Sequence, residues 1–236
     1  VGVGHQLPYV FIGRNGFAKT FEKVIFGTWL ARMSLVGEFI GMPYCFGMSC
    51  LIRKSIVDGI GGLEALSDYM AEDYLLIVAA RDQGYQTVVS PQPAWQNSGD
   101  GSIIELFRRM HRWPWIRFGM FPHLMVLEPL SNFTTLGILA AWSIWTLFGW
   151  DPWLTFAGLT LLWCVSDYLL MRVVQGGPVS MGIPQYLVAW TLRELMTLVT
   201  FVGAILRRNI KWRGPVKYTR SWGGKTARLT DEKVRY

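Results

Sequence analysis

Cysteine and charge are both scarce in this sequence. Only three of the 236 residues are cysteines, Cys45, Cys50 and Cys164, and their number is odd and their spacing irregular. A disulfide framework or a zinc site needs a regular set of cysteines, so neither is expected and a reducing compartment is favoured. Charged residues account for 17% of the chain and hydrophobic residues for 51%. This balance is typical of a membrane protein and argues against a soluble enzyme.

The apolar residues are concentrated in three long, nearly uncharged stretches, Thr134–Trp150, Trp153–Val174 and Tyr186–Leu206. Each is close to the roughly 20 residues that span a hydrocarbon core. Tryptophans lie at the edges of the stretches, as is common at membrane interfaces. We therefore predict a membrane-embedded helical region over residues 123–206, with a buried helical bundle as the alternative.

Ionisable residues inside these apolar stretches are expensive to place in a membrane. They are Asp167 and the neighbouring pair Arg193 and Glu194. We expect them to neutralise one another between adjacent helices. The alternative is that they line a cleft where a lipid acceptor binds.

Basic residues are concentrated at the C-terminus. The chain has a net charge of +7, and residues 207–236 hold ten Lys or Arg residues and only two acids. No basic stripe occurs elsewhere, so we predict that this tail is a cytosolic flank on anionic headgroups and not a nucleic-acid site. Three full membrane spans after a cytosolic region would place the tail on the opposite side. One stretch is then interfacial or re-entrant, or the tail breaks the charge rule.

Residues 1–122 mix charge, glycine and short apolar runs like an α/β domain. Three helices and two strands are predicted before residue 100. The helices are Phe17–Arg32, Lys54–Ile60 (closed by Gly61-Gly62) and Glu72–Gln83 (ended by Gly84), and the strands are Tyr44–Arg53 and Tyr85–Ser90. A basic, aromatic amphipathic helix is predicted from Ser102 to about Trp113, where Pro114 starts a break.

Two polar clusters are candidates for chemistry. Glu72 and Asp73 begin a helix, where carboxylates ordinarily stabilise the helix dipole. Arg109, Arg112 and Trp113 are spaced to share one helix face. Two guanidinium groups beside an indole suit a diphosphate, whereas an interfacial helix would use the same residues to contact lipid headgroups. Both interpretations of this second cluster can hold together.

Several short motifs occur in a fixed order from the first residues to the tail. They are His5-Gln6-Leu7-Pro8-Tyr9, Gly47-Met48-Ser49-Cys50, Gly61-Gly62, Glu72-Asp73-Tyr74, Arg81, Gly84, Gln96-Asn97-Ser98-Gly99, Arg109-x-x-Arg112-Trp113, Glu128-Pro129, Val174-Gln175-Gly176-Gly177, Ala189-Trp190 and Trp222-Gly223-Gly224. Each is weak alone, but the ordered set resembles the ceramide glucosyltransferase family. That family is related to the inverting, GT-A-type cellulose, chitin and hyaluronan synthases, which usually have glutamine in place of Arg109.

The resemblance implies the C-terminal part of a GT-A-type catalytic domain, followed by interfacial and transmembrane helices. It implies transfer of glucose from UDP-glucose to ceramide, giving glucosylceramide, by a multi-pass Golgi membrane enzyme whose catalytic part faces the cytosol. The alternatives are a processive polysaccharide synthase, for which the apolar region is small, and a non-catalytic truncated membrane protein.

Roles for individual residues follow from the same resemblance. Asp73 would be the general base that takes the proton from the ceramide hydroxyl, and Glu72 would bind substrate beside it. Arg109, Arg112 and Trp113 would close over the donor, and His5 would lie near the donor or the acceptor. No residue of this chain is predicted to ligate a metal.

The family also uses two earlier acidic motifs, one for the uridine and one for a divalent cation, Mg²⁺ or Mn²⁺, on the donor diphosphate. Neither motif occurs here, and no initiator methionine, signal peptide or N-terminal anchor precedes Val1. We therefore expect the sequence to be a fragment that is inactive by itself, with the implied activity belonging to the parent protein.

Overall fold

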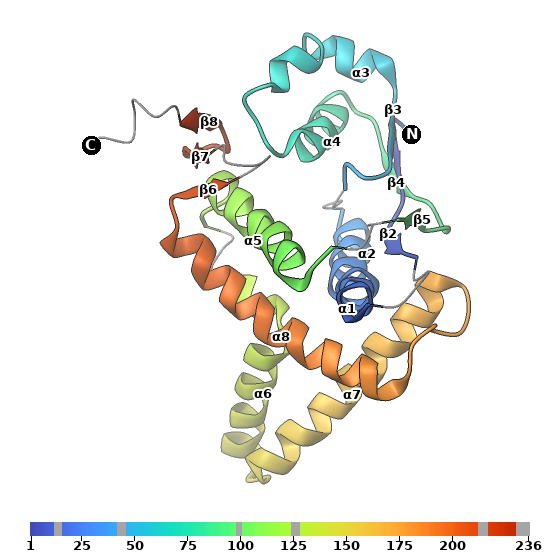
Figure 1. The fold of residues 1–236 in the computed structure, drawn as a ribbon, viewed down its shortest axis with the longest axis vertical. Coiled ribbons are helices and arrows are strands. Elements are labelled where there is room, and N and C mark those ends of the chain that lie inside the picture. The colour runs from blue at the N-terminus through green and yellow to red at the C-terminus, as the bar shows by residue number, and fades with distance from the viewer. Residues whose placement is uncertain (12–15, 42–45, 98–100, 124–127, 212–216, 230–236) are drawn as a thin grey trace.

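The computed structural model describes residues 1–11, 16–41, 46–97, 101–123, 128–211 and 217–229. Within these ranges the protein is a mixed α/β structure that is mostly helical (Figure 1). Two small sheets lie near the N-terminus, a group of long helices forms the centre, and a separate sheet closes the C-terminal end. The mixed α/β class and the long apolar helices agree with the sequence-based prediction.

Short parallel pairings build the N-terminal sheets. β1 (Val3–His5) lies between β3 (Cys50–Ile52), which is antiparallel to it, and β4 (Thr87–Val89), which is parallel. β2 (Pro8–Val10) and β5 (Ala94–Gln96) continue the parallel pairing as a second ladder. Proline lacks the amide hydrogen that a ladder needs. The prolines at 8, 91 and 93 therefore account for the interruption between the β1–β4 ladder and the β2–β5 ladder.

The predicted strands are each confirmed only in part. Tyr85–Ser90 contains β4, but Tyr44–Arg53 is too long, because residues 47–49 form a turn before β3. Residues 44 and 45 lie outside the described part of the chain. The sequence analysis did not identify β1, β2 or β5.

The first predicted helix is confirmed and is longer than expected. It runs through α1 (Phe17–Ile25), a π-helical segment (Phe26–Leu30) and α2 (Ala31–Phe39). In the π-helical segment the Thr28 hydroxyl donates to the Val24 carbonyl at 2.5 Å. Such segments are rare in helices and are frequent near functional sites.

The other two predicted helices before residue 90 are also present. α3 (Lys54–Gly59) is followed by Gly61 and Gly62, each with a φ of 87°, a left-handed value that favours glycine. A 3₁₀ turn (Leu63–Leu66) then leads to α4 (Glu72–Asp82), which carries both candidate carboxylates in its first turn.

Helix α5 (Ile103–Met120) does not end at Pro114, so the predicted break there is wrong. Ser102 and Glu105 form a capping box at its start. A proline inside a helix costs about 3 kcal/mol because it removes one backbone hydrogen bond and crowds the preceding turn. Packing just after the proline offsets this cost, since Trp115 is completely buried and its indole donates to the Arg207 carbonyl at 3.1 Å.

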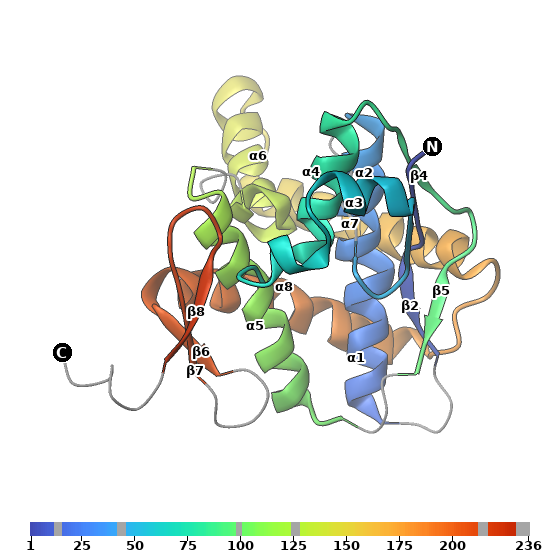
Figure 2. The same ribbon diagram turned by 90° about the horizontal axis from the view of Figure 1, so that it is seen from above.

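The three apolar stretches are confirmed as helices α6 (Phe133–Phe148), α7 (Pro152–Gln175) and α8 (Ile183–Leu206). α7 and α8 are long and apolar enough to cross a membrane, and α6 is a shorter apolar helix. α6 and α7 pack together as a hairpin, and α8 runs across α1 and α5 (Figures 1 and 2).

The main hydrophobic core combines residues from both sides of the predicted boundary at residue 123. Val24 and Ile25 of α1 and Met110 of α5 are buried together with Met171 of α7 and Trp190 of α8. The apolar helices are therefore packed against the N-terminal part, although the division into 1–122, 123–206 and 207–236 remains a prediction.

The charges inside the apolar helices neutralise one another, as expected. Arg193 of α8, which is 1% exposed, pairs with Asp167 of α7 at 2.8 Å and with the neighbouring Glu194. Asp167 also pairs with Arg32 of α2 and accepts a hydrogen bond from the Trp190 indole at 2.9 Å. This buried network joins α2, α7 and α8.

The basic tail is a folded element, which the sequence analysis did not foresee. β6 (Asn209–Lys211), β7 (Lys217–Arg220) and β8 (Thr226–Leu229) form an antiparallel sheet. Arg220 of β7 donates to the carbonyls of Trp115 at 2.9 Å and Ala204 at 2.8 Å. The sheet is thereby fixed to the ends of α5 and α8.

The buried charge network yields a stability prediction. Asp167→Asn should lower the free energy of unfolding by about 3–5 kcal/mol, because Arg193 would remain buried with less neutralising charge. The control is Asp58→Asn, which removes an exposed ion pair with Lys54 and should change stability by at most about 0.5 kcal/mol. Unfolding in mild detergent, followed by tryptophan fluorescence, measures both. Equal effects of the two substitutions would contradict a structural role for the network.

Candidate active site

The candidate base is held in place by backbone amides. Asp73 is the second residue of α4, and its Oδ2 accepts a hydrogen bond from the Gly47 N–H at 2.8 Å. Its Oδ1 accepts one from the Tyr74 N–H, also at 2.8 Å. Burial raises the pKa of the Asp73 carboxyl, and these amide hydrogen bonds act in the opposite direction. Asp73 is therefore a fixed carboxylate with increased basicity.

The Arg–Trp face of α5 approaches the same turn. Trp113 lies 6.1 Å, between ring centroids, from Phe46, the residue before Gly47. Close to Asp73, the ring of Tyr74 packs edge to face against Phe121 at 5.2 Å. These contacts bring the start of α4, residues 46–49 and α5 together.

Arg112 lies in the electrostatic field of the other candidate carboxylate. Burial lowers the pKa of the Arg112 guanidinium, and the charge of Glu72 opposes that shift. Glu72 is exposed and Arg112 is half-buried. The structure thus places Glu72, Asp73, Arg112 and Trp113 around one region.

Arg109 has a partner that the sequence analysis missed. Its guanidinium forms an ion pair with Glu22 of α1 and lies 6.0 Å from the ring centroid of Phe26. Glu22 is 6% exposed. No local sequence signal connects residues this far apart in the chain. A bound diphosphate would bind the Arg109 guanidinium together with the Glu22 carboxylate or would replace Glu22 as its partner.

His5 ends β1 and is 2% exposed. Among the described residues, neither ring nitrogen has a hydrogen-bond partner. Burial lowers the pKa of the imidazole, so His5 is largely neutral at pH 7. The next residue, Gln6, accepts a hydrogen bond from the Ser49 hydroxyl at 2.8 Å, which connects this strand to the turn that holds Asp73. His5 is therefore near that turn, without a direct contact to the other candidates.

His111, on the same helix as the Arg–Trp cluster, faces away from it. Its imidazole is buried against Gly203 of α8, where a Cβ would lie only 2.7 Å from Nε2. This close approach positions α5 along α8.

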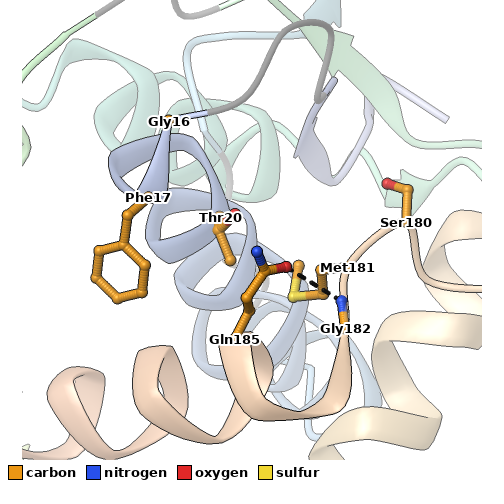
Figure 3. A pocket seen from close by; sticks show the side chains of 7 residues that line it. All are labelled: Gly16, Phe17, Thr20, Ser180, Met181, Gly182 and Gln185. Carbon is orange, nitrogen blue, oxygen red and sulfur yellow. Dashed lines mark hydrogen bonds between the residues drawn. The ribbon is translucent and has the colours of Figure 1, made fainter.

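A separate pocket of about 550 Å³ lies between the start of α1 and the loop before α8 (Figure 3). It is lined by Gly16, Phe17, Thr20, Ser180, Met181, Gly182 and Gln185. Lys23 donates to Ser180 at 3.0 Å and is 2% exposed, and burial lowers its pKa to about 8. None of the predicted site residues lines this pocket.

The described residues do not contain a group of three His, Cys, Asp or Glu side chains that could hold a metal ion. Glu72 and Asp73 are adjacent carboxylates, but both Asp73 oxygens already accept backbone hydrogen bonds. The divalent cation implied by the family does not fit the described residues as a ligand set.

Comparison with known proteins identifies first the class and then the family. The family description that matches residues 1–226 is "Glycosyl transferase family 21". The match covers nearly the whole chain, so the class is glycosyltransferase. The chain belongs to glycosyl transferase family 21.

Curated relatives agree with this assignment. Ceramide glucosyltransferase 1 of Caenorhabditis elegans is 37% identical over 220 residues, which cover 93% of this chain and 47% of the relative. Ceramide glucosyltransferase 3 of the same organism is 34% identical, with the same coverage of both chains. Ceramide glucosyltransferase of Komagataella phaffii is 24% identical over 64% of this chain and 36% of its own length. The chain thus spans about half the length of the C. elegans relatives it matches. No solved structure matches.

The Glu22–Arg109 pair provides a test of the site's construction. Glu22→Gln should lower the free energy of unfolding by about 1–3 kcal/mol, because a partly buried guanidinium loses its counter-charge. Exposed Glu64 offers the control, and Glu64→Gln should be neutral. Adding Arg109→Gln to Glu22→Gln should cost less than the sum of the two single changes. Strict additivity would show that the two residues do not interact.

Proposed function

We propose that this chain supplies the general base of an inverting ceramide glucosyltransferase and the residues that bind its leaving group. The donor would be UDP-glucose, the acceptor the primary hydroxyl of ceramide, and the product glucosylceramide. One observation carries the proposal: in a chain of this family, the fixed carboxylate of Asp73 and the Arg–Trp face of α5 both contact the segment Phe46–Gly47. The names of the relatives supply the acceptor, ceramide, and the transferred sugar, glucose, whereas UDP-glucose as the donor is part of the proposal.

In the proposed reaction, Asp73 activates the acceptor. An alcohol is too weak an acid to ionise beforehand, so its proton must move to a nearby base in the transition state. The ceramide oxygen forms a bond to the anomeric carbon while the bond to UDP breaks, and the proton passes to Asp73. A single displacement of this kind inverts the α-linked donor to a β-glucoside. Burial of Asp73 raises its basicity and so supports this role.

The leaving diphosphate would meet the cationic face of α5. Arg112 is half-buried. In such a site the hydrogen bonds that its guanidinium donates to phosphate are stronger than they would be in water. Arg109, held by Glu22, is positioned to add a second fork. Trp113 packs between Phe26 and Phe46 and would exclude water from the region.

The surroundings of the site fit a membrane-bound enzyme with a lipid acceptor. We include in the proposal that the N-terminal sheets belong to a GT-A-type domain and that α6 and α7 enter the membrane. The proposed location is the cytosolic face of the Golgi. The divalent cation of the family would need ligands other than the described residues.

Asp73→Asn should abolish transfer in the whole gene product, because the amide keeps the size of the side chain but does not accept the proton. The control is Asp82→Asn at the other end of α4, which should retain normal turnover. Glucosylceramide formed by membranes that contain each variant is quantified by mass spectrometry. More than a tenth of normal turnover in Asp73→Asn would rule Asp73 out as the base.

Arg112→Lys should also be severe, because lysine keeps the charge but loses the donor fork that grips phosphate. We expect at least a tenfold loss of turnover with unchanged liposome flotation. The matched control is Arg108→Lys on the exposed side of the same helix, which should affect neither property. If Arg112→Lys reduced flotation alone, α5 would be an interfacial helix without a role in donor binding.

A further inference from the structure

The C-terminal sheet touches the N-terminal part of the chain directly. The Thr226 N–H donates to the Asp68 carbonyl at 2.8 Å, and Lys225 forms a β-bridge with Tyr69. The Gly223 N–H donates to the Gly119 carbonyl at 3.1 Å. A hydrocarbon core is about 30 Å thick, so no bilayer can separate residues in contact. The tail and residues 1–122 must lie on the same side of a membrane.

Helix α8 has two opposite faces. Arg193, Thr200 and Ala204 lie on the inner face and are almost completely buried, next to α1, α5 and the tail. On the outer face, Leu195, Val199 and Val202 are each more than half exposed. These positions follow helical spacing, so one continuous apolar stripe faces outward. The same pattern characterises helices that lie in the plane of a membrane surface.

The number of membrane crossings must be even. α6 and α7 are consecutive and form a hairpin, so the chain returns to its starting side after α7 (Figure 1). A third crossing by α8 would place the tail on the opposite side, against its contacts with Asp68 and Tyr69. In the most apolar 18-residue window, 39% of α8 but only 17% of α7 is buried in protein, so α7 is the better candidate for a lipid-surrounded span.

We propose that α8 does not cross the membrane. It lies in the plane of the leaflet nearest the N-terminal sheets, with its outer stripe against the acyl chains of that leaflet. The tail stays beside residues 1–122, so its basic residues face the headgroups on that side. This proposal rests on the membrane location included in the proposed function and defines how the active site is oriented there.

Cysteine labelling tests the sidedness without any sugar-transfer assay. In a variant lacking the native cysteines, Glu64→Cys and Lys217→Cys are placed separately on exposed positions of the N-terminal part and the tail. The protein is incorporated into sealed phosphatidylcholine–phosphatidylserine vesicles and exposed to a membrane-impermeant maleimide. Both sites should be labelled in equal proportion before the vesicles are opened. Labelling of one site with protection of the other would overturn the proposal.

Depth measurements test the position of α8. Spin labels at Val188, Leu195 and Val202, introduced through cysteine, should report the same shallow depth from their accessibility to oxygen and to a polar nickel complex. Ala189→Cys on the buried face is the matched control and should be accessible to neither reagent. A depth that passes through the bilayer centre along the helix would show that α8 spans. Exclusion of oxygen from the outer sites, with coupling between labels, would show that a second copy covers the stripe.

Discussion

The long helices depend on the neutralisation of one buried guanidinium, that of Arg193. Removing such a group from water costs several kcal/mol, and a helix that carries it is stable only where carboxylates and donors are already arranged around it. Asp167 of α7 and Glu194 of α8 supply the negative charge that neutralises Arg193. Arg32 extends the network to α2. The relative positions of these helices are therefore set by electrostatics as well as by apolar burial.

The candidate active site depends on α8 through α5. His111 rests on α8 at Gly203, where a larger residue would force the imidazole to shift, and the Trp115 indole donates to the Arg207 carbonyl just beyond the end of α8. α5 in turn presents Arg112 and Trp113 to the turn that fixes Asp73. An interfacial α8 would thus hold the candidate site at a constant height above the leaflet from which the proposed lipid acceptor would come.

Much of the helical structure could be predicted from the sequence, because periodic burial and glycine stops are local signals. The three-residue strands β1, β2 and β5 could not, since proline and glycine mask so short a pattern. Pro114 was misleading because tertiary packing of Trp115 outweighs its local penalty. The choice of Asp73, Arg112 and Trp113 as candidate site residues followed from the ordered motifs. The pairing of Glu22 with Arg109 could not be predicted, because an ion pair between residues far apart in the chain leaves no pattern in the spacing of residues along the sequence.

The anomeric configuration of the product tests the proposed chemistry most directly. The purified gene product, in lipid, would be given UDP-glucose and ceramide, and the linkage of the glycolipid determined by the proton coupling of its anomeric carbon in NMR spectra. A single attack assisted by Asp73 must give β-glucosylceramide. An α-linked product would exclude a single back-side displacement assisted by Asp73, and a polymer would indicate a different acceptor. Either result would contradict the proposed mechanism.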